Sequence, residues 1–149
     1  MAKIRITKEF KFEMAHALLG YDGPCRNVHG HSYELEITAI GEPITDKKHV
    51  KLGMVMDFGD LKRVVMRKII NVFDHALVLN NEMSTEITNQ LRQNFDKVIL
   101  LNYQPTSELM VIDFAEKIAS ELPDGVKLIR VMLRETATSF AEWIAADQI

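Results

Sequence analysis

Two stretches near the start of the chain alternate between apolar and polar positions. Within residues 4–16 and again within residues 29–39, one side is largely apolar or aromatic and the other carries mostly charged or hydroxyl groups. A period of two is typical of a β-strand with one buried and one solvent-facing side. Histidines continue the apolar sides, one ending the first strand and two beginning the second: His16, His29 and His31.

Helical spacing replaces this alternation from residue 58 onward. Apolar residues recur three or four positions apart, and Asp57 precedes them as a suitable N-cap, so a helix is predicted over residues 58–72. A second helix is expected after Thr106, and Ser84 is placed to cap a shorter one within the polar segment 81–97. Residues 98–101 are expected to form a short buried strand or an extended connector, and further strands are predicted at residues 129–135 and 138–145.

The order of these elements indicates the fold class. Two strands come first, helices follow, and two strands end the chain, which favours an α+β fold with an antiparallel sheet. The 149 residues are long enough for one hydrophobic core, so a single domain over residues 1–149 is expected. Hydrophobic residues make up 47% and charged residues 26%, as is usual for a globular protein in water.

The charge and the cysteine content restrict the possible binding partners and the cellular location of the protein. The 18 basic and 21 acidic side chains give a net charge of −3, and no basic face that would favour nucleic acid is evident. Charges interrupt every short apolar stretch at the N-terminus, which argues against a signal peptide, and no apolar run is long enough to span a membrane. Because Cys25 is the one cysteine, a reducing, cytoplasmic location is expected.

The three histidines form the main candidate site. His29 and His31 stand two residues apart, so their side chains leave a strand on one face, and His16 can join them from a neighbouring strand. Three imidazoles leave one position open on a zinc ion, which is the arrangement of catalytic zinc sites. The alternative is that the three are ordinary strand histidines satisfied by hydrogen bonds.

Cys25 lies four residues before His29, in a loop rich in glycine and proline. It can be the fourth ligand of a closed structural site, or a thiol close to the metal that is not a ligand. A nearby cation favours the thiolate form, which can act as a base. An inert buried cysteine is the third interpretation, and its polar neighbours argue against it.

Two further positions carry candidate chemistry. Asp74 and His75 follow the end of the predicted helix, where a carboxylate can orient an imidazole for proton transfer; the alternative is a turn residue beside a surface histidine. Glu135 ends an apolar strand face, where its carboxylate can bind a ligand with two adjacent N–H groups. The alternative is that the strand has already reached solvent there.

Taken together, the motifs resemble the 6-pyruvoyltetrahydropterin synthase superfamily, and within it the 6-carboxytetrahydropterin synthase branch of queuosine biosynthesis. The resemblance runs from about residue 8 to residue 136 and rests on six motifs in order: Phe12-Glu13-Met14-Ala15-His16, Cys25-x-x-x-His29-Gly30-His31-Ser32-Tyr33, Met56-Asp57-Phe58-x-x-Leu61-Lys62, Asp74-His75, Pro105-Thr106-Ser107-Glu108 and Arg134-Glu135-Thr136. Three residues separate Cys25 from His29, as in the carboxy-pterin branch, whereas the pyruvoyl branch typically has five. Residues 81–103 are longer than in compact members.

The resemblance implies a zinc-dependent lyase that converts 7,8-dihydroneopterin triphosphate to 6-carboxy-5,6,7,8-tetrahydropterin, acetaldehyde and triphosphate. It implies zinc ligation by the three histidines, proton removal by Cys25 and a proton relay through Asp74 and His75. Glu135 would anchor the pterin ring, close to Thr106 and Ser107. Two alternatives stay open: a pyruvoyl-type synthase that eliminates triphosphate without losing carbon, and a non-catalytic zinc-stabilised binding module.

The fold that the resemblance implies is the tunnelling fold, with a four-stranded antiparallel sheet and helices packed on one face. The sheets of several subunits would join into a barrel, so a homo-oligomer is expected, such as a hexamer. Its active sites would lie at subunit interfaces, with Asp74, His75 and Glu135 supplied by a neighbouring subunit.

Overall fold

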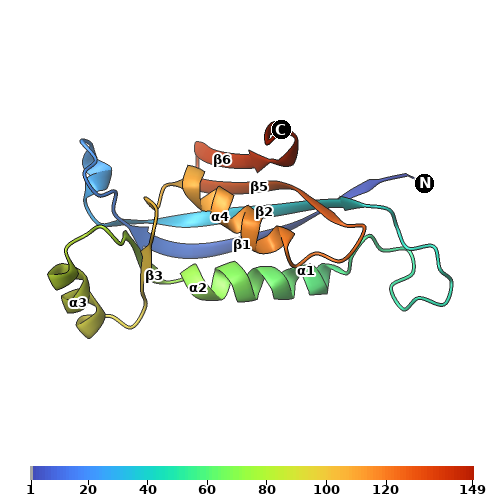
Figure 1. The fold of residues 1–149 in the computed structure, drawn as a ribbon, viewed down its shortest axis with the longest axis horizontal. Helices are drawn as coiled ribbons and strands as arrows, with labels where there is room; N and C mark the ends of the chain where they lie inside the picture. Colours follow the sequence, from blue (N-terminus) through green and yellow to red (C-terminus); the bar gives the residue numbers. More distant parts are fainter. Residues whose placement is uncertain (1) are drawn as a thin grey trace.

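The computed structural model describes residues 2–149 and is built on one long sheet (Figure 1). Six strands are hydrogen-bonded in the order β4-β3-β1-β2-β5-β6. Their bounds are Ile4–His16 (β1), His29–Gly41 (β2), Ala76–Asn80 (β3), Val98–Leu101 (β4), Lys127–Thr136 (β5) and Ser139–Ile144 (β6). The long antiparallel pair β1–β2 forms the centre, in the register that places His16 opposite His29.

The prediction of a four-stranded antiparallel sheet is wrong in strand number and direction. Four strands are antiparallel, but β3 adds to β1 in parallel and β4 adds to β3 in parallel, which gives a mixed six-stranded sheet. Residues 98–101 form the strand β4, which is one of the two expectations for this segment. The strand β3 was not predicted, because it has four apolar residues followed by Asn80 and shows no alternation. The helix between β3 and β4 forms the crossover that a parallel pair needs, whereas β3 comes to lie beside β1 only after the chain has passed through β2 and the first helical run.

The helices begin where the sequence predicts. Asp57 caps α1 (Phe58–Val65) by accepting a hydrogen bond from the N–H of Gly59, and Thr106 caps α4 (Ser107–Ala119) by accepting from Leu109. The predicted helix 58–72 is one helical run that passes through a π-helical stretch, Met66–Ile70, into the short α2 (Asn71–Phe73). The polar segment 81–97 contains α3 (Thr85–Asn94), which begins directly after Ser84.

The core lies between one face of the sheet and the helices, so the expectation that helices pack on one face holds for α1, α2 and α4 (Figure 1). Phe12 on β1 stacks on Tyr33 of β2 with ring centroids 5.0 Å apart, and Phe114 of α4 packs against Phe12 and Phe73. The opposite face of the sheet is polar; for example, Ser32 donates a hydrogen bond to Glu13.

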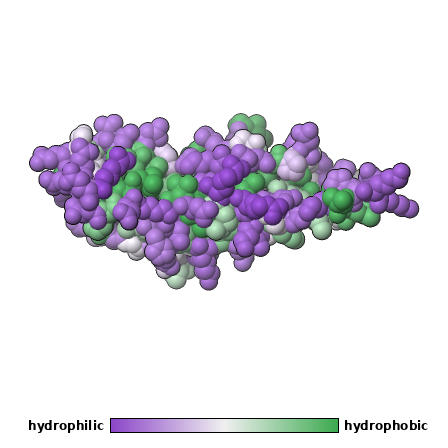
Figure 2. Space-filling view, turned by 90° about the horizontal axis from the view of Figure 1, so that it is seen from below, coloured by the Kyte–Doolittle hydropathy of each residue, from purple (hydrophilic) through white to green (hydrophobic). Residues whose placement is uncertain are grey.

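The surface carries apolar residues in separate patches between polar side chains, as Figure 2 shows for one side of the molecule. Among the exposed large apolar side chains are Phe58, Ile87 and Phe95. Within residues 2–149, none of the helices combines the length and the apolar character needed to cross a lipid bilayer.

The aromatic contacts of α4 predict a large effect of truncation. Replacing the fully buried Phe114 by alanine leaves a cavity between α4 and β1, and we expect the free energy of unfolding to fall by about 3–5 kcal/mol. Ile112 on the same helix is half exposed, so Ile112→Ala is the matched control, with an expected loss of about 1 kcal/mol or less. Urea unfolding measures both; equal losses would contradict this packing.

Candidate metal centre and active site

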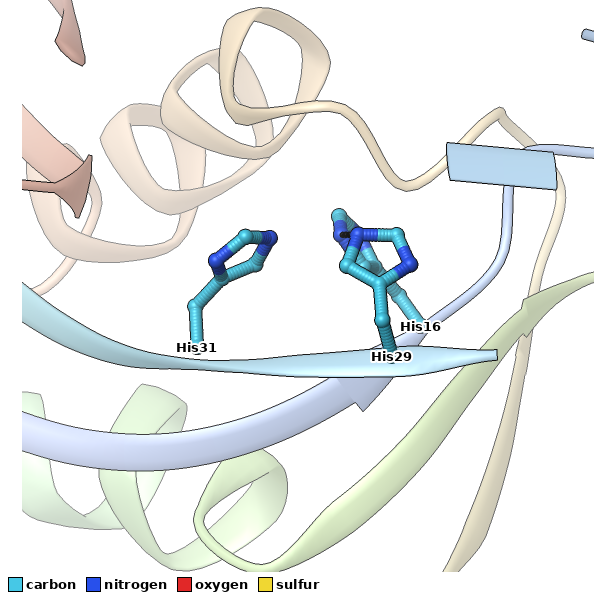
Figure 3. A group of neighbouring side chains, drawn as sticks. All are labelled: His16, His29 and His31. Atoms are coloured by element: carbon cyan, nitrogen blue, oxygen red, sulfur yellow. Dashed lines mark hydrogen bonds between the residues drawn. The ribbon is translucent and has the colours of Figure 1, made fainter. Parts of the chain in front are cut away.

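The three predicted histidines meet at the joined ends of β1 and β2. His16 is the last residue of β1 and pairs with His29, the first residue of β2, while His31 follows two residues later on the same face. Figure 3 shows the three rings gathered on one side of the strands. Their candidate ligand nitrogens all lie within 4.8 Å of one another. The strand register alone therefore brings the cluster together.

Main-chain carbonyl groups fix which nitrogens of the cluster are free. Nδ1–H of His16 donates to the carbonyl of Pro105 at 2.7 Å, and Nδ1–H of His29 donates to the carbonyl of Asn27 at 2.8 Å. A carbonyl can only accept, so each Nδ1 carries the proton and each neutral ring presents a lone pair at Nε2. These two Nε2 atoms are 3.1 Å apart. Two lone pairs at that distance repel each other, and a cation between or beside them would relieve the repulsion.

Burial makes a proton a poor choice for that cation. The pKa of His16 is lowered below its ordinary value, chiefly because the side chain is removed from water, and the neighbouring His29 lowers it further. Burial likewise lowers the pKa of His31. No described residue makes a hydrogen bond to the buried Nε2 of His31. Three converging imidazoles are a donor set that suits zinc, so the residues present fit such an ion.

Glu135 lies against the cluster of its own chain. Its Oε1 is 3.4 Å from Nε2 of His16 and 3.3 Å from Nε2 of His31. The resemblance implies that a neighbouring subunit supplies Glu135, but Glu135 already reaches the histidine cluster of its own chain. Glu135 lies on the same β5 face as the buried Val131 and Leu133. Its carboxylate adds negative charge beside the free nitrogens, which further favours a cation there.

Cys25 is close to the site but outside the histidine cluster. It lies in the short 3₁₀ turn Pro24–Arg26 and is half-buried, and its carbonyl accepts a hydrogen bond from the N–H of Leu18, just after β1. Among the described residues, the group that could hold a metal consists of the three histidines without the thiol. This arrangement favours an open metal site over the closed site that the sequence left as an alternative.

The start of α4 borders the cluster through the carbonyl of Pro105. Thr106 uses its hydroxyl to cap the helix, whereas the Oγ of Ser107 is buried and has no hydrogen-bond partner among the described residues. The hydroxyl of Tyr33, whose ring lies 5.6 Å from that of His31, is also buried without such a partner. Sequence reasoning did not single out Tyr33, although it continues the face of His29 and His31.

Asp74 and His75 form a tight pair, but away from the histidine cluster. Oδ1 of Asp74 is 3.1 Å from Nδ1 of His75 and accepts the main-chain N–H of Glu13, which holds the pKa of Asp74 below its usual range. His75 lines a hollow to which Glu13, Ser32 and also His31 contribute. The side chains of Glu13 and Ser32 leave the sheet on the face opposite to the side chain of His31. Within one chain, the pair and the cluster therefore serve different faces.

Comparison with known proteins identifies a family, similar sequences and similar folds. The family model described as 6-pyruvoyl tetrahydropterin synthase matches residues 5–145. Proteins named 6-carboxy-5,6,7,8-tetrahydropterin synthase are similar along the chain. The one from Haemophilus influenzae is 36% identical over 93% of this chain and 97% of its own, and the one from Aquifex aeolicus is 31% identical over 95% and 98%.

Solved structures share the fold at lower identity. An uncharacterized protein from Wolinella succinogenes superposes with a TM-score of 0.76 at 21% identity, covering 97% of this chain and 99% of its own. The 6-pyruvoyl tetrahydropterin synthase of Caenorhabditis elegans superposes with a TM-score of 0.69 at 24% identity, covering 97% of both chains. With the match of the family model over almost the whole length, the chain belongs to the 6-pyruvoyl tetrahydropterin synthase family.

Proposed function

We propose that the protein is a zinc-dependent 6-carboxytetrahydropterin synthase. It would convert 7,8-dihydroneopterin triphosphate and one water to 6-carboxy-5,6,7,8-tetrahydropterin, acetaldehyde and triphosphate, within 7-deazapurine (queuosine) biosynthesis in the cytoplasm. The observation that carries the proposal is the pair of free Nε2 atoms of His16 and His29, 3.1 Å apart. The names of the similar proteins from Haemophilus influenzae and Aquifex aeolicus support the choice of product.

His16, His29 and His31 would hold the zinc through their Nε2 atoms. Such an ion supplies Lewis acidity, which lowers the pKa of side-chain hydroxyl groups and stabilises developing negative charge on oxygen. The carbonyls of Pro105 and Asn27 keep two of the rings in the tautomer that leaves Nε2 free. Outer hydrogen bonds of this kind orient ligands before the metal arrives.

The chain's own groups would move the protons. Cys25, which is outside the histidine cluster, would take a proton from the substrate side chain as thiolate. Asp74 orients His75, which would return or accept protons. Because this pair faces the other side of its own sheet, it would act in the site of a second copy, so the active form would be a homo-oligomer with sites at subunit interfaces.

Glu135 and the start of α4 would bind the pterin ring. The Glu135 carboxylate can accept two N–H groups from the aminopyrimidine edge, and its partial exposure leaves it open to a ligand. The buried Oγ of Ser107 has no partner among the described residues, so a polar edge of the ring would satisfy it, with Thr106 next to it.

A pyruvoyl-type synthase is the second candidate, because the family model carries that description. It would keep all three side-chain carbons and release triphosphate alone. The three-residue spacing between Cys25 and His29 favours the carboxy-pterin product.

Removing a ligand should remove the metal. We expect the purified protein to bind one zinc per chain, and His29→Ala to weaken zinc binding by more than about a hundredfold because one of three nitrogen donors is lost. His49→Ala is the matched control, since His49 lies in an exposed loop. Isothermal titration with zinc measures both; equal affinity of the two variants would exclude this site.

Removal of the Cys25 thiol should lower turnover without releasing the metal. We expect Cys25→Ala to keep one zinc per chain while kcat falls about 100- to 10,000-fold, because the proton acceptor is gone. Turnover is followed with dihydroneopterin triphosphate by mass spectrometry of the pterin and by an acetaldehyde assay. Loss of zinc in this variant would support the closed structural site, and a product that keeps three side-chain carbons would support the pyruvoyl-type synthase.

Glu135→Gln separates ring binding from metal binding. An amide cannot accept two N–H groups as the carboxylate does, so we expect KM to rise about tenfold or more with zinc content unchanged. Glu142→Gln on β6 is the control, because Glu142 binds Arg130 on the sheet. Zinc loss in Glu135→Gln would instead assign this carboxylate to the metal.

A further inference from the structure

The main chain is strained at the candidate proton relay. His75 has a φ of 60°, and it is the one non-glycine residue among residues 2–149 with a positive φ. An L-residue with a Cβ adopts this left-handed conformation only when its surroundings impose it, and such strain gathers at functional sites. The imidazole itself is largely exposed, so packing of the ring does not impose it.

Several hydrogen bonds hold the turn, and most of them come from main chain. The N–H of Asp74 donates to Ile70 at the end of the helix, and the N–H of His75 donates to the carbonyl of Glu13 at 2.6 Å. Oδ1 of Asp74 accepts the N–H of Glu13 in return at 2.9 Å. These bonds connect the turn to β1 and to the preceding helix. None of them involves the main-chain carbonyl of Asp74, which needs another hydrogen-bond donor.

Lys97 is the side chain that satisfies it. Its Nζ donates to the carbonyl of Asp74, the group immediately before the strained residue. The carbonyl of Lys97 accepts the N–H of Leu77, two residues after His75. Lys97 therefore holds the turn from both sides, and it is half-buried although a lysine head group prefers water. Lys97 lies just after α3, in the segment 81–103, which contains none of the site residues predicted from the sequence.

We propose that Lys97 is a positioning residue for the Asp74–His75 relay, which it acts on by fixing the left-handed turn. The inference rests on the proposed function, because it assumes that His75 transfers protons. His75 and Lys97 line the same hollow of about 740 Å³, with Val28, Leu91 and Phe95. A fixed turn keeps the imidazole directed into that hollow.

The first test separates positioning from folding in the full-length, zinc-loaded protein. Lys97→Met keeps the length of the side chain and removes the donor; we expect kcat to fall about tenfold while KM stays within about twofold and zinc content is unchanged. Lys97→Arg keeps a donor and should restore much of the rate. Lys47→Met, at an exposed loop lysine, is the control and should match the wild type. Wild-type kcat in Lys97→Met would overturn the proposal.

A double variant tests whether Lys97 acts through His75. In the His75→Ala background, Lys97→Met should cause no further loss of kcat, because the group that it positions is absent. A second tenfold loss would overturn the proposal.

Hydrogen exchange of the His75 amide tests the turn without using activity. The exchange rate should rise about tenfold in Lys97→Met and stay at the wild-type value in Lys47→Met, because the turn opens more often. An unchanged rate overturns the proposal. If the wild-type protein had no turnover, the proposed function would fail, whereas this measurement would still decide the role of Lys97.

Discussion

The Nε2 atoms of His16 and His29 face each other across 3.1 Å, and this contact sets the requirements for the rest of the site. Left alone it would be repulsive, because the carbonyls of Pro105 and Asn27 hold the protons on the far side of each ring. Burial of His16 makes protonation unfavourable. The arrangement is therefore suited to a metal cation, for which the fold offers a third nitrogen from His31 and a nearby carboxylate from Glu135.

The sheet explains why one chain holds only part of the proposed machinery. Its buried face presents the histidines, Glu135 and the start of α4, whereas the Asp74–His75 turn serves the polar face. The imidazole of His75 is exposed and its backbone is held in a strained turn. Both features suit a proton relay that acts on a substrate bound by another copy of the chain. The exposed edges of β4 and β6 are places where such sheets can meet.

The parts of the structure that the sequence predicts correctly are those with strong local patterns. The alternation in residues 4–16 and 29–39 located β1 and β2 and put three histidines on one face, and Asp57 and Thr106 marked the starts of helices. The strand β3 was not predicted because Ala76–Asn80 is short and shows no alternation, and its parallel pairing depends on where the preceding helix ends. The nearness of Glu135 to His16 depends on the β2–β5 register, and the role of Lys97 depends on a contact across 23 residues. No local pattern encodes either.

The coordination shell of bound zinc tests the account most directly. X-ray absorption at the zinc edge of the loaded protein measures the ligand atoms and their distances. The account predicts nitrogen and oxygen neighbours at about 2.0–2.1 Å, three of them imidazoles, with no sulfur. A zinc–sulfur distance of about 2.3 Å would place Cys25 on the metal and contradict the open, catalytic site.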